Sequence, residues 1–580
     1  MTAEPSKVVT EFFSEFWEWR MKESPEFASY CGDHRYDDRL DDYSLDAFKK
    51  RLSDAKDFLE RCHKLEGTAG LNEDEKLSLA ILASDLKTYI SGANYEGYCF
   101  PVSYMEGIHA DWEQYIAWMD FNTLQDYQKY TSRVKALTKR VKQSEDLMRH
   151  GASKGLTFHS VSMSGVPDGL ESMATATPES TVFLKPYKTA PESIDKSALK
   201  TLEQEASKAV KDQVQPALKS LKEFIANEYM SKCRPDVGVS CIPNGEKFYQ
   251  ECLDWHLTLR MSPQEVHDLG LKEVARIKKL MNEAMRKTGF KGDFPAFLDH
   301  LRTDKKFYFD SKESMLNGFR DICDNLIRPT LTKLFHNIPS AVLDIEEVPE
   351  SKRNGPAAYY IAGTVDGSRP GKYYVNCHKL DMCPKYEMMT LSLHEGEPGH
   401  HFQGMHAIQM KSVPTFRQYI EDLNYYMVPS RFPLNTAYCE GWGLYSEYLG
   451  EELGLYEDPY TLFGHLSFEM HRACRLVADT GLHAMGWTYD QASKYFMDNT
   501  ALSPSFIKNE IHRYITWPGQ ACGYKVGELK IKELREKAAK KLGDRFDVRD
   551  FHEVVLSSLM VSLTVLESLV DKYINEKLAA

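Results

Sequence analysis

The chain has 580 residues and a formal net charge of −13, from 72 Lys and Arg against 85 Asp and Glu. Hydrophobic residues make up 42% of it, which is typical of a soluble globular protein, and its length predicts more than one packed lobe. The negative charge argues against a nucleic-acid partner, because binding to a phosphate backbone needs a concentrated basic surface.

A secreted or membrane-spanning protein is not indicated either. Residues 1–7 lack the basic, apolar and small-residue order of a signal peptide. The most apolar stretch, residues 554–566, is shorter than the about 20 apolar residues that cross a bilayer, so it predicts a buried helix. The 12 Cys show neither a Cys-x-x-Cys pair nor the spacing of a disulfide framework. These features predict a cytoplasmic protein without a membrane partner.

Most of the chain is expected to be helical. Apolar residues recur at three- and four-residue spacing, which is the period of an amphipathic helix. This pattern covers residues 7–30, 44–65, 73–91, 123–150 and 196–231. Clusters of Gly and Pro predict a loop-like stretch at residues 161–195 and a break at residues 233–247.

Strand-forming residues gather in one part of the sequence. Residues 359–365 and 373–375 are rich in Tyr, Ile and Val, and the turn-rich residues 366–371 separate them. They predict a hairpin or two edge strands. The expected fold class is therefore mainly α with a small β-sheet. In this interpretation residues 1–330 form a helical N-terminal lobe, and residues 331–580 form a lobe with the sheet and the motifs described next.

A cluster of metal-binding residue types follows the predicted strands. His394 and Glu395 are followed by His400 and His401. Neutral imidazoles bind zinc, and an adjacent carboxylate can deprotonate a zinc-bound water. On a straight helix His401 would return to the face of His394 but would lie roughly 10 Å further along the axis. Pro398 and Gly399 break the helix, which favours His400 as the second ligand and leaves His401 as the alternative.

A second motif lies about 40 residues further on, by the numbering of the chain. Glu440 and Glu447 are one heptad apart and so share a helix face. A zinc site needs a third protein ligand from another element, which suits Glu440. Gly441 and Gly443 each disfavour a helix by roughly 1 kcal/mol, which predicts a close backbone approach at this point.

The two motifs together resemble a known family. His394-Glu395-x-x-Pro-Gly-His400-His401 with Glu440-Gly-Trp-Gly-Leu-Tyr-x-Glu447 is similar to the family called domain of unknown function 885, and the resemblance covers most of the chain. Its members are thought to be relatives of the gluzincin zinc metallopeptidases. The segment Cys439-Glu440-Gly-Trp-Gly is also similar to an element of gluzincin aminopeptidases in which the Glu is the third zinc ligand.

The resemblance implies a two-lobed helical architecture around a deep cleft that admits short peptides. It also implies Zn²⁺ held by His394, His400 and Glu440, with Glu395 as the general base. Glu447, one heptad after Glu440, is expected to contact the metal ligands without binding the metal itself.

Supporting residues are expected on the helix at residues 468–487. Arg472, Arg475, Asp479 and His483 are three or four residues apart, so they lie on one helix face. Asp479 could hold the second ring nitrogen of a ligand histidine, and His483 could donate to a developing oxyanion. The alternative interpretation is a ladder of side chains that stabilises the helix.

Residues 513–525 offer groups for the substrate. Tyr514 or Tyr524 could donate to the oxyanion, and Arg513 or Lys525 could pair with the terminal carboxylate of a peptide. Ordinary packing and surface charge are the alternative for each of them. The strand that contains Tyr374 could pair with an extended peptide through its main chain, or could simply pack in the sheet.

The sequence therefore predicts a zinc-dependent hydrolase that cleaves peptide bonds in short peptides, as an oligopeptidase or in a carboxypeptidase-like manner. Two alternatives stay open at this point. One is a metal-dependent enzyme that acts on a non-peptide amide or ester. The other is a non-catalytic helical binding protein that keeps the fold. The oligomeric state is not indicated.

Overall fold

The computed structural model describes residues 4–350, 353, 356–364, 369–410, 413–421 and 423–579. In this part of the chain the fold is mainly helical, with one three-stranded sheet. The predicted fold class is thereby confirmed at this level. The predicted lobes on either side of residue 330, and a cleft between them, stay predictions.

The N-terminal helices agree with the predicted ranges. They are α1 (Glu4–Glu23), α2 (Pro25–Tyr30), α3 (Leu45–Glu66), α4 (Glu73–Gly92), α5 (Ile108–Ala117) and α6 (Leu124–Ser153). The predicted helix at residues 7–30 is divided, because Pro25 starts a new helix after Ser24. Capping fixes the next starts: Ser44 accepts a hydrogen bond from the amide of Ala47, and Asn72 forms a capping box with Glu75.

The following region contains two helices within the stretch predicted as a loop and further helices within the range predicted as helical. Its helices are α7 (Val166–Thr175), α8 (Lys185–Lys188), α9 (Lys196–Ala209) and α10 (Gln215–Phe224). The loop prediction for residues 161–195 is wrong in part, because Pro167 and Pro186 lie in the first turns of α7 and α8, where proline is tolerated. The predicted helix at residues 196–231 is present, with two π-helical stretches. The predicted break at residues 233–247 ends at the start of α11 (Gly245–Leu257).

Helices from the middle and the end of the chain pack together. The middle contributes α12 (Pro263–Lys287), α13 (Phe294–Thr303) and α14 (Lys312–Asp321). α12 packs along α19 (Pro459–Ala484), and a buried cluster unites residues 274–307 with residues 463–521. A larger cluster joins α1, α6 and α11 to the C-terminal helices. The core thus connects segments from both sides of residue 330.

The sheet has the order β1-β3-β2, with β1 (Leu343–Glu347) parallel to β3 (Gly371–Val375) and β2 (Ala358–Ile361) antiparallel to it. The antiparallel pairing of β2 and β3 was predicted, although residues 365–368 lie outside the described residues. The prediction that the strand at residues 373–375 is an edge strand is wrong, because β1 covers its other side.

The C-terminal half is helical again. Its helices are α15 (Met388–Glu395), α16 (His400–Gln409), α17 (Thr415–Gln418), α18 (Thr436–Leu453), α20 (Tyr489–Asn499), α21 (Pro504–Thr516), α22 (Gly523–Leu542), α23 (Val548–Ser557) and α24 (Leu563–Ala579), beside α19. The single buried helix predicted at residues 554–566 is wrong. The chain turns between α23 and α24, where Leu559 has a positive φ of 60°.

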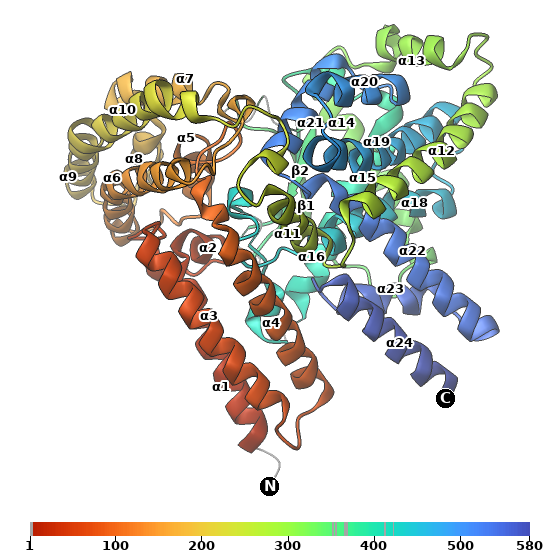
Figure 1. The fold of residues 1–580 in the computed structure, drawn as a ribbon, viewed down its shortest axis with the longest axis horizontal. Coiled ribbons are helices and arrows are strands. Elements are labelled where there is room, and N and C mark those ends of the chain that lie inside the picture. The colour runs from red at the N-terminus through yellow and green to blue at the C-terminus, as the bar shows by residue number, and fades with distance from the viewer. Residues whose placement is uncertain are drawn as a thin grey trace.

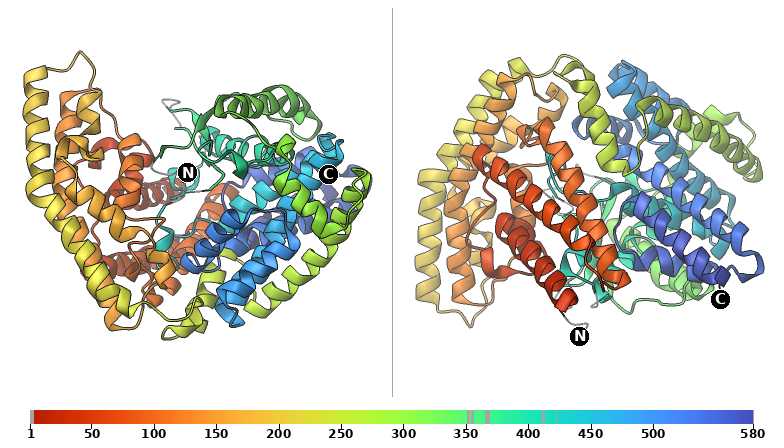
Figure 2. Two further views of the ribbon diagram at one scale, coloured as in Figure 1. Left: turned by 90° about the horizontal axis from the view of Figure 1, so that it is seen from above. Right: turned by 60° about the horizontal axis from the view of Figure 1, so that its bottom comes forward.

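Figure 1 shows α6 to α10 on one side of the molecule and α12 with α18 to α22 on the other, with the sheet, α11 and α16 between them. The two further views in Figure 2 show the same separation, with the C-terminal helices opposite α6 to α10. Among the described residues, none of the helices combines the length and the apolar character needed to cross a membrane.

Candidate metal centre

Two consecutive helices bring His394 and His400 together. α15 ends at Glu395, the chain turns over residues 396–399, and α16 begins at His400. A Cβ atom on Gly399 would overlap the carbonyl oxygen of His394, so this turn requires glycine. As a result the two imidazole rings lie 4.7 Å apart, centre to centre, and are nearly perpendicular at 86°. The predicted break at Pro398 and Gly399 is confirmed.

Glu440 on α18 completes a three-residue group. Its Oε2 atom lies 3.4 Å from Nε2 of His394 and 3.3 Å from Nε2 of His400. All three candidate ligand atoms lie within 4.8 Å of one another. The structure therefore brings two imidazole nitrogens and one carboxylate oxygen to one point, from three helices. These are ligand types that zinc accepts.

Gly441 and Gly443 permit this approach. A Cβ atom on Gly443 would lie 2.7 Å from Cε1 of His394, so the glycine makes room for the ring. A Cβ atom on Gly441 would lie 2.5 Å from the backbone of Gly527 on α22. The predicted close backbone approach at both glycines is confirmed. It sets α18 directly against α15 on one side and α22 on the other.

Glu447 holds the other nitrogen of His394. The Oε1 atom of Glu447 lies 2.8 Å from Nδ1 of His394, and Arg472 on α19 pairs with the same oxygen at 3.1 Å. Burial opposes a charge on His394, yet hydrogen bonds to Glu440 and Glu447 raise its pKa to about 9. A buried carboxylate on the second ring nitrogen fixes the orientation of a ligand histidine, as Glu447 does here.

Glu395 lies in the same charged group. It is the last residue of α15 and is buried. Burial raises its pKa above the ordinary range, while the nearby charges of His394 and His400 oppose that shift. The structure thus places a buried carboxyl within electrostatic range of the three candidate ligands.

His401, the alternative second ligand, faces away. Its Nδ1 atom is 3.1 Å from the hydroxyl of Tyr360 on β2, and its Nε2 atom is 3.3 Å from the carbonyl oxygen of Ala341. Burial lowers the pKa of His401 to about 4. Because α16 starts at His400, neighbouring side chains diverge by about 100° and only His400 points to Glu440.

Tyr524 is the tyrosine that lies beside this group. Its ring stacks on that of His394 at 6.3 Å and 17°. Its hydroxyl oxygen accepts a hydrogen bond from Nη2 of Arg513 at 3.0 Å, and the guanidinium of Arg475 lies 4.4 Å from its ring centre. Burial and the carboxylate of Glu440 raise the pKa of Tyr524. The predicted substrate residues Tyr524 and Arg513 are therefore close to the candidate ligands.

Tyr514 contacts Glu510 and Arg475 and not the candidate ligands. Its hydroxyl donates to Oε2 of Glu510 at 2.8 Å, and Arg475 donates to the same carboxylate at 2.7 Å. Burial opposes the negative charge of Glu510, yet the charges of Arg475 and Arg513 lower its pKa well below the ordinary range. In this arrangement Tyr514 orients Glu510 and Arg475 rather than the predicted oxyanion.

His483 and Asp479 are not brought to the site. His483 is bonded through both ring nitrogens, to the amide of Val239 and the carbonyl of Tyr514. Asp479 accepts from the hydroxyl of Tyr249 at 2.6 Å and the amide of Gly519 at 3.0 Å. Their predicted roles are not supported, because both lie further along α19 than Arg472, and its far end packs on α11.

Lys525 and Tyr374 also lie elsewhere than predicted. Lys525 is fully buried, and its Nζ atom lies 2.6 Å from Glu469 and 2.5 Å from Glu528, so its charge is used inside the protein. Side chains alternate along a strand, and the neighbour Tyr373 is the buried one that packs with Phe319. Tyr374 therefore points to the opposite face, where its ring stacks on Tyr359.

Two residues of the site were missed by the sequence prediction. Arg472 was predicted to lie on one helix face without a role of its own, yet it pairs with Glu447. Trp442 donates from Nε1 to the carbonyl oxygen of Pro398 at 2.8 Å and so ties α18 to the turn between the two histidines. The Trp lies inside the Glu440 motif, so its position in the motif was the available signal.

Comparisons with known proteins agree with the fold. A crystal structure from Colwellia psychrerythraea, described as a "putative lipoprotein", has a TM-score of 0.89 at 27% identity, over 99% of each chain. A structure from Shewanella oneidensis, described as a "putative lipoprotein of unknown function", has a TM-score of 0.65 at 18% identity, over 97% of this chain and 99% of that one, and shows the fold alone. No curated protein matches the chain. A family model described as "Bacterial protein of unknown function (DUF885)" matches residues 25–570, so the chain belongs to this family.

Proposed function

We propose that the chain is a metal-dependent hydrolase that cleaves peptide bonds in short peptides, and that it is a relative of the gluzincin metallopeptidases. One observation carries the proposal. Two imidazole nitrogens and a carboxylate oxygen, from His394, His400 and Glu440, converge within 4.8 Å, and the carboxyl of Glu395, the next residue after His394, is buried within electrostatic range of them. A hydrolase of this kind needs three protein ligands and a base at one point.

The donor set fits zinc. Two neutral imidazoles and one carboxylate are a common set for a catalytic zinc ion, and three protein ligands leave a position open for water or substrate. Glu447 fixes the orientation of His394 through Nδ1, at 2.8 Å. When bound, the ion would polarise the scissile carbonyl and lower the pKa of a water.

The proton transfers are assigned to Glu395. In this proposal its carboxylate accepts a proton from the attacking water and delivers it to the nitrogen of the leaving amine. Tyr524 is the group we assign to the developing oxyanion. Arg513 donates to its oxygen at 3.0 Å, which leaves the hydroxyl hydrogen to donate to another acceptor.

The substrate is proposed to carry a free carboxylate near the cleaved bond. Three buried guanidinium nitrogens close to Tyr524 have no hydrogen-bond partner within the described part of the chain: Nε of Arg472, Nη1 of Arg475 and Nε of Arg513. An excess of arginine donors favours an anionic group, and a peptide terminus supplies one. This supports carboxypeptidase-like or oligopeptidase action on short peptides. A cytoplasmic location stays a prediction from the sequence.

Replacement of Glu395 by Gln tests the proposal. The variant should bind zinc in the same stoichiometry as the wild type, and its hydrolysis of a mixture of short peptides, followed by mass spectrometry, should fall by about 10²- to 10⁴-fold. Glu457→Gln is the control, because this exposed carboxylate, which follows α18, is expected to leave activity largely unchanged.

Two results would overturn the proposal. One is full activity of Glu395→Gln. The other is a zinc-loaded wild type that cleaves no peptide. If that wild type cleaves small amides or esters instead, the site is a metallohydrolase for non-peptide substrates. If it binds no zinc at saturating concentration, a non-catalytic binding protein is favoured.

A further inference from the structure

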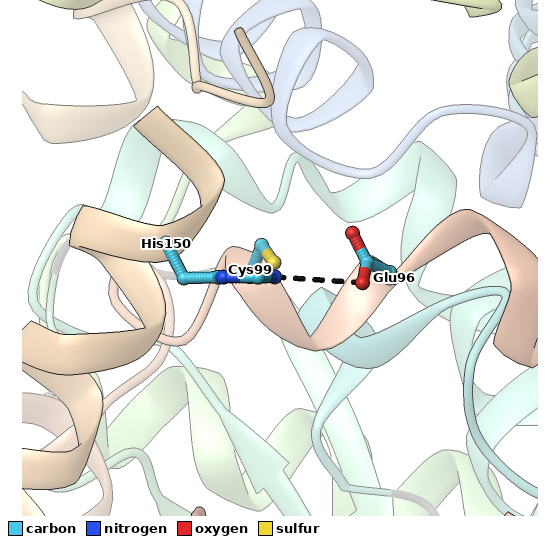
Figure 3. A group of neighbouring side chains, drawn as sticks. All are labelled: Glu96, Cys99 and His150. Carbon is cyan, nitrogen blue, oxygen red and sulfur yellow. Dashed lines mark hydrogen bonds and ion pairs between the residues drawn. The ribbon is translucent and has the colours of Figure 1, made fainter. Parts of the chain in front are cut away.

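A second group of metal-binding residue types lies on other elements than the first. It consists of Glu96, Cys99 and His150, and one ligand atom from each lies within 4.8 Å of the others. Glu96 precedes the short helix η3 (Gly97–Cys99), Cys99 is its last residue, and His150 lies in the last turns of α6. Figure 3 shows Cys99 beside the pair formed by His150 and Glu96, whose Nε2 and Oε1 atoms are 3.4 Å apart.

The backbone is shaped to bring these residues together. A Cβ atom on Gly151, the neighbour of His150, would lie 2.8 Å from the Cβ atom of Cys99, so only glycine allows α6 and η3 to approach this closely. Glu96 has a left-handed backbone with a φ of 51°. Cys99 is fully buried, while the side chains of Glu96 and His150 keep about a quarter of their surface exposed, 23% and 25%. An ion could thus reach a buried sulfur from solvent.

The carboxylate of Glu96 is oriented by neighbours that are not ligands. Its Oε2 atom accepts a hydrogen bond from Nζ of Lys154 at 2.6 Å, and its Oε1 atom accepts one from the hydroxyl of Tyr98 at 3.2 Å. Oε1 is also the atom that faces His150. Second-layer contacts of this kind commonly orient a carboxylate that binds a metal through its other oxygen.

The sulfur of Cys99 is buried beside the carboxylate of Glu96 and the imidazole of His150. Metal ions bind a cysteine as its thiolate. Metal binding would replace the thiol proton, which leaves to solvent, so the metal and not the proton would neutralise the buried sulfur.

We infer that Glu96, Cys99 and His150 form a second divalent-cation site, distinct from the group at His394, His400 and Glu440. A thiolate, an imidazole and a carboxylate are the donor set of a zinc-class ion, whereas Mg²⁺ and Ca²⁺ prefer oxygen ligands alone. Three protein ligands leave the fourth position to water. Catalysis is not assigned to this site.

The role of the second site is structural. A Cβ atom on Gly97 would lie 2.5 Å from the carbonyl oxygen of Val428, so η3 packs directly on the segment that leads into α18. An ion shared by Cys99 and His150 would tie that segment to α6 through η3. It would connect helices on opposite sides of the molecule in Figure 1, where α6 and α18 lie apart.

Metal stoichiometry of the full chain tests the inference. Wild type loaded with zinc and dialysed should retain two ions, as measured by plasma mass spectrometry. Cys99→Ser and His150→Gln should each retain one, and so should His394→Ala, which removes the other site. His150 is partly exposed, so its variant should fold even if the change at buried Cys99 does not allow folding. A zinc content in His150→Gln equal to that of the wild type, both at saturating zinc, would overturn the inference.

Cobalt supplies a readout that identifies the sulfur. A thiolate bound to Co²⁺ gives a charge-transfer absorption in the near ultraviolet, which histidine and carboxylate ligands do not give. The band should be lost in Cys99→Ser and kept in Cys439→Ser, whose sulfur lies 3.9 Å from Nδ1 of His400 at the first site. A band that survives in Cys99→Ser would also overturn the inference. Both readouts are independent of peptide hydrolysis, so their failure is distinguishable from failure of the proposed function.

Discussion

The Nδ1 atom of His394 lies 2.8 Å from Oε1 of Glu447, one heptad along α18 from Glu440. The same helix therefore presents one carboxylate to each ring nitrogen of a single histidine, since Glu440 faces Nε2 at 3.4 Å. This arrangement fixes the orientation of the ring. It gives Glu447 a role that a surface glutamate could not have.

Glu447→Gln should weaken zinc binding by about 10- to 100-fold, because the negative charge behind His394 is lost. Competition with a chelator of known affinity would measure the change, and excess zinc should restore part of the activity. The exposed Glu457, which follows α18, supplies the control Glu457→Gln. Unchanged zinc affinity in Glu447→Gln would show that the carboxylate does not support the ligand.

Gly443→Ala should displace the ring of His394, because the new Cβ atom would lie 2.7 Å from Cε1 of that ring. We expect at least a tenfold loss of zinc affinity with little change in helical content. The comparison is Gly404→Ala on α16, where the nearest atom would be at 3.5 Å, an ordinary contact distance. Circular dichroism and metal analysis of both variants would check this, and equal zinc binding in the two would contradict it.

Lys525→Met should destabilise the protein by up to about 3–5 kcal/mol, because it removes a buried cation that three carboxylates share, although Arg276 and Lys532 still pair with them. The Nζ atom of Lys525 lies 2.6 Å from Glu469, 2.5 Å from Glu528 and 3.3 Å from Glu273, and the lysine is fully buried. Urea unfolding would measure the loss. The exposed Lys540, on the same helix, should tolerate the same replacement within about 0.5 kcal/mol. Equal stability of the two variants would show that Lys525 does not hold these helices together.

Asp479 should make stability depend on pH. Burial raises its pKa to about 7 in the folded protein, from 3.8, despite hydrogen bonds from Tyr249 and Gly519. The folded state then binds the proton more tightly, so this contribution to the unfolding free energy is complete below about pH 4 and is lost as the pH rises to about 7. The slope is at most about 1.4 kcal/mol per pH unit.

Urea unfolding across that range would measure the slope for the wild type and for Asp479→Asn. The variant has no carboxyl to titrate, so the difference in stability between the two proteins should change with pH between about 4 and 7 and stay constant above. A constant difference throughout this range would mean that folding does not raise the pKa of Asp479.

The helices and the three candidate metal ligands could be predicted from the sequence, because both depend on the local pattern of residues. The range predicted at residues 44–65 differs from α3 by a single residue at each end, since periodicity and the cap at Ser44 act within one helix. His394, His400 and Glu440 were identified by residue type and by the helix-breaking Pro398. The choice of His400 over His401 followed from where α16 can start.

Contacts between residues that are far apart in the sequence were predicted less well. β1 pairs with β3 in parallel, and a parallel partner carries no turn signal next to it in the sequence, so β3 was taken for an edge strand. On α19 the face that contains Arg472 also contains His483, but eleven residues separate them, which is roughly 16 Å along the axis. Periodicity identifies the residues that share a helix face, but it does not show which end of that face lies at the candidate metal centre.

The crossing of Gly441 and Gly527 has a consequence for how this protein can vary. A Cβ atom on Gly527 would overlap the carbonyl oxygen of Ala437, and one on Gly441 would lie 2.5 Å from Gly527. α18 contains Glu440 and α22 contains Tyr524. The distance between these two side chains is therefore determined by the direct backbone contact of the two helices. Many substitutions in the surrounding core could therefore be accepted without moving the carboxylate of Glu440 relative to the hydroxyl of Tyr524. Gly441 and Gly527 themselves tolerate no larger residue.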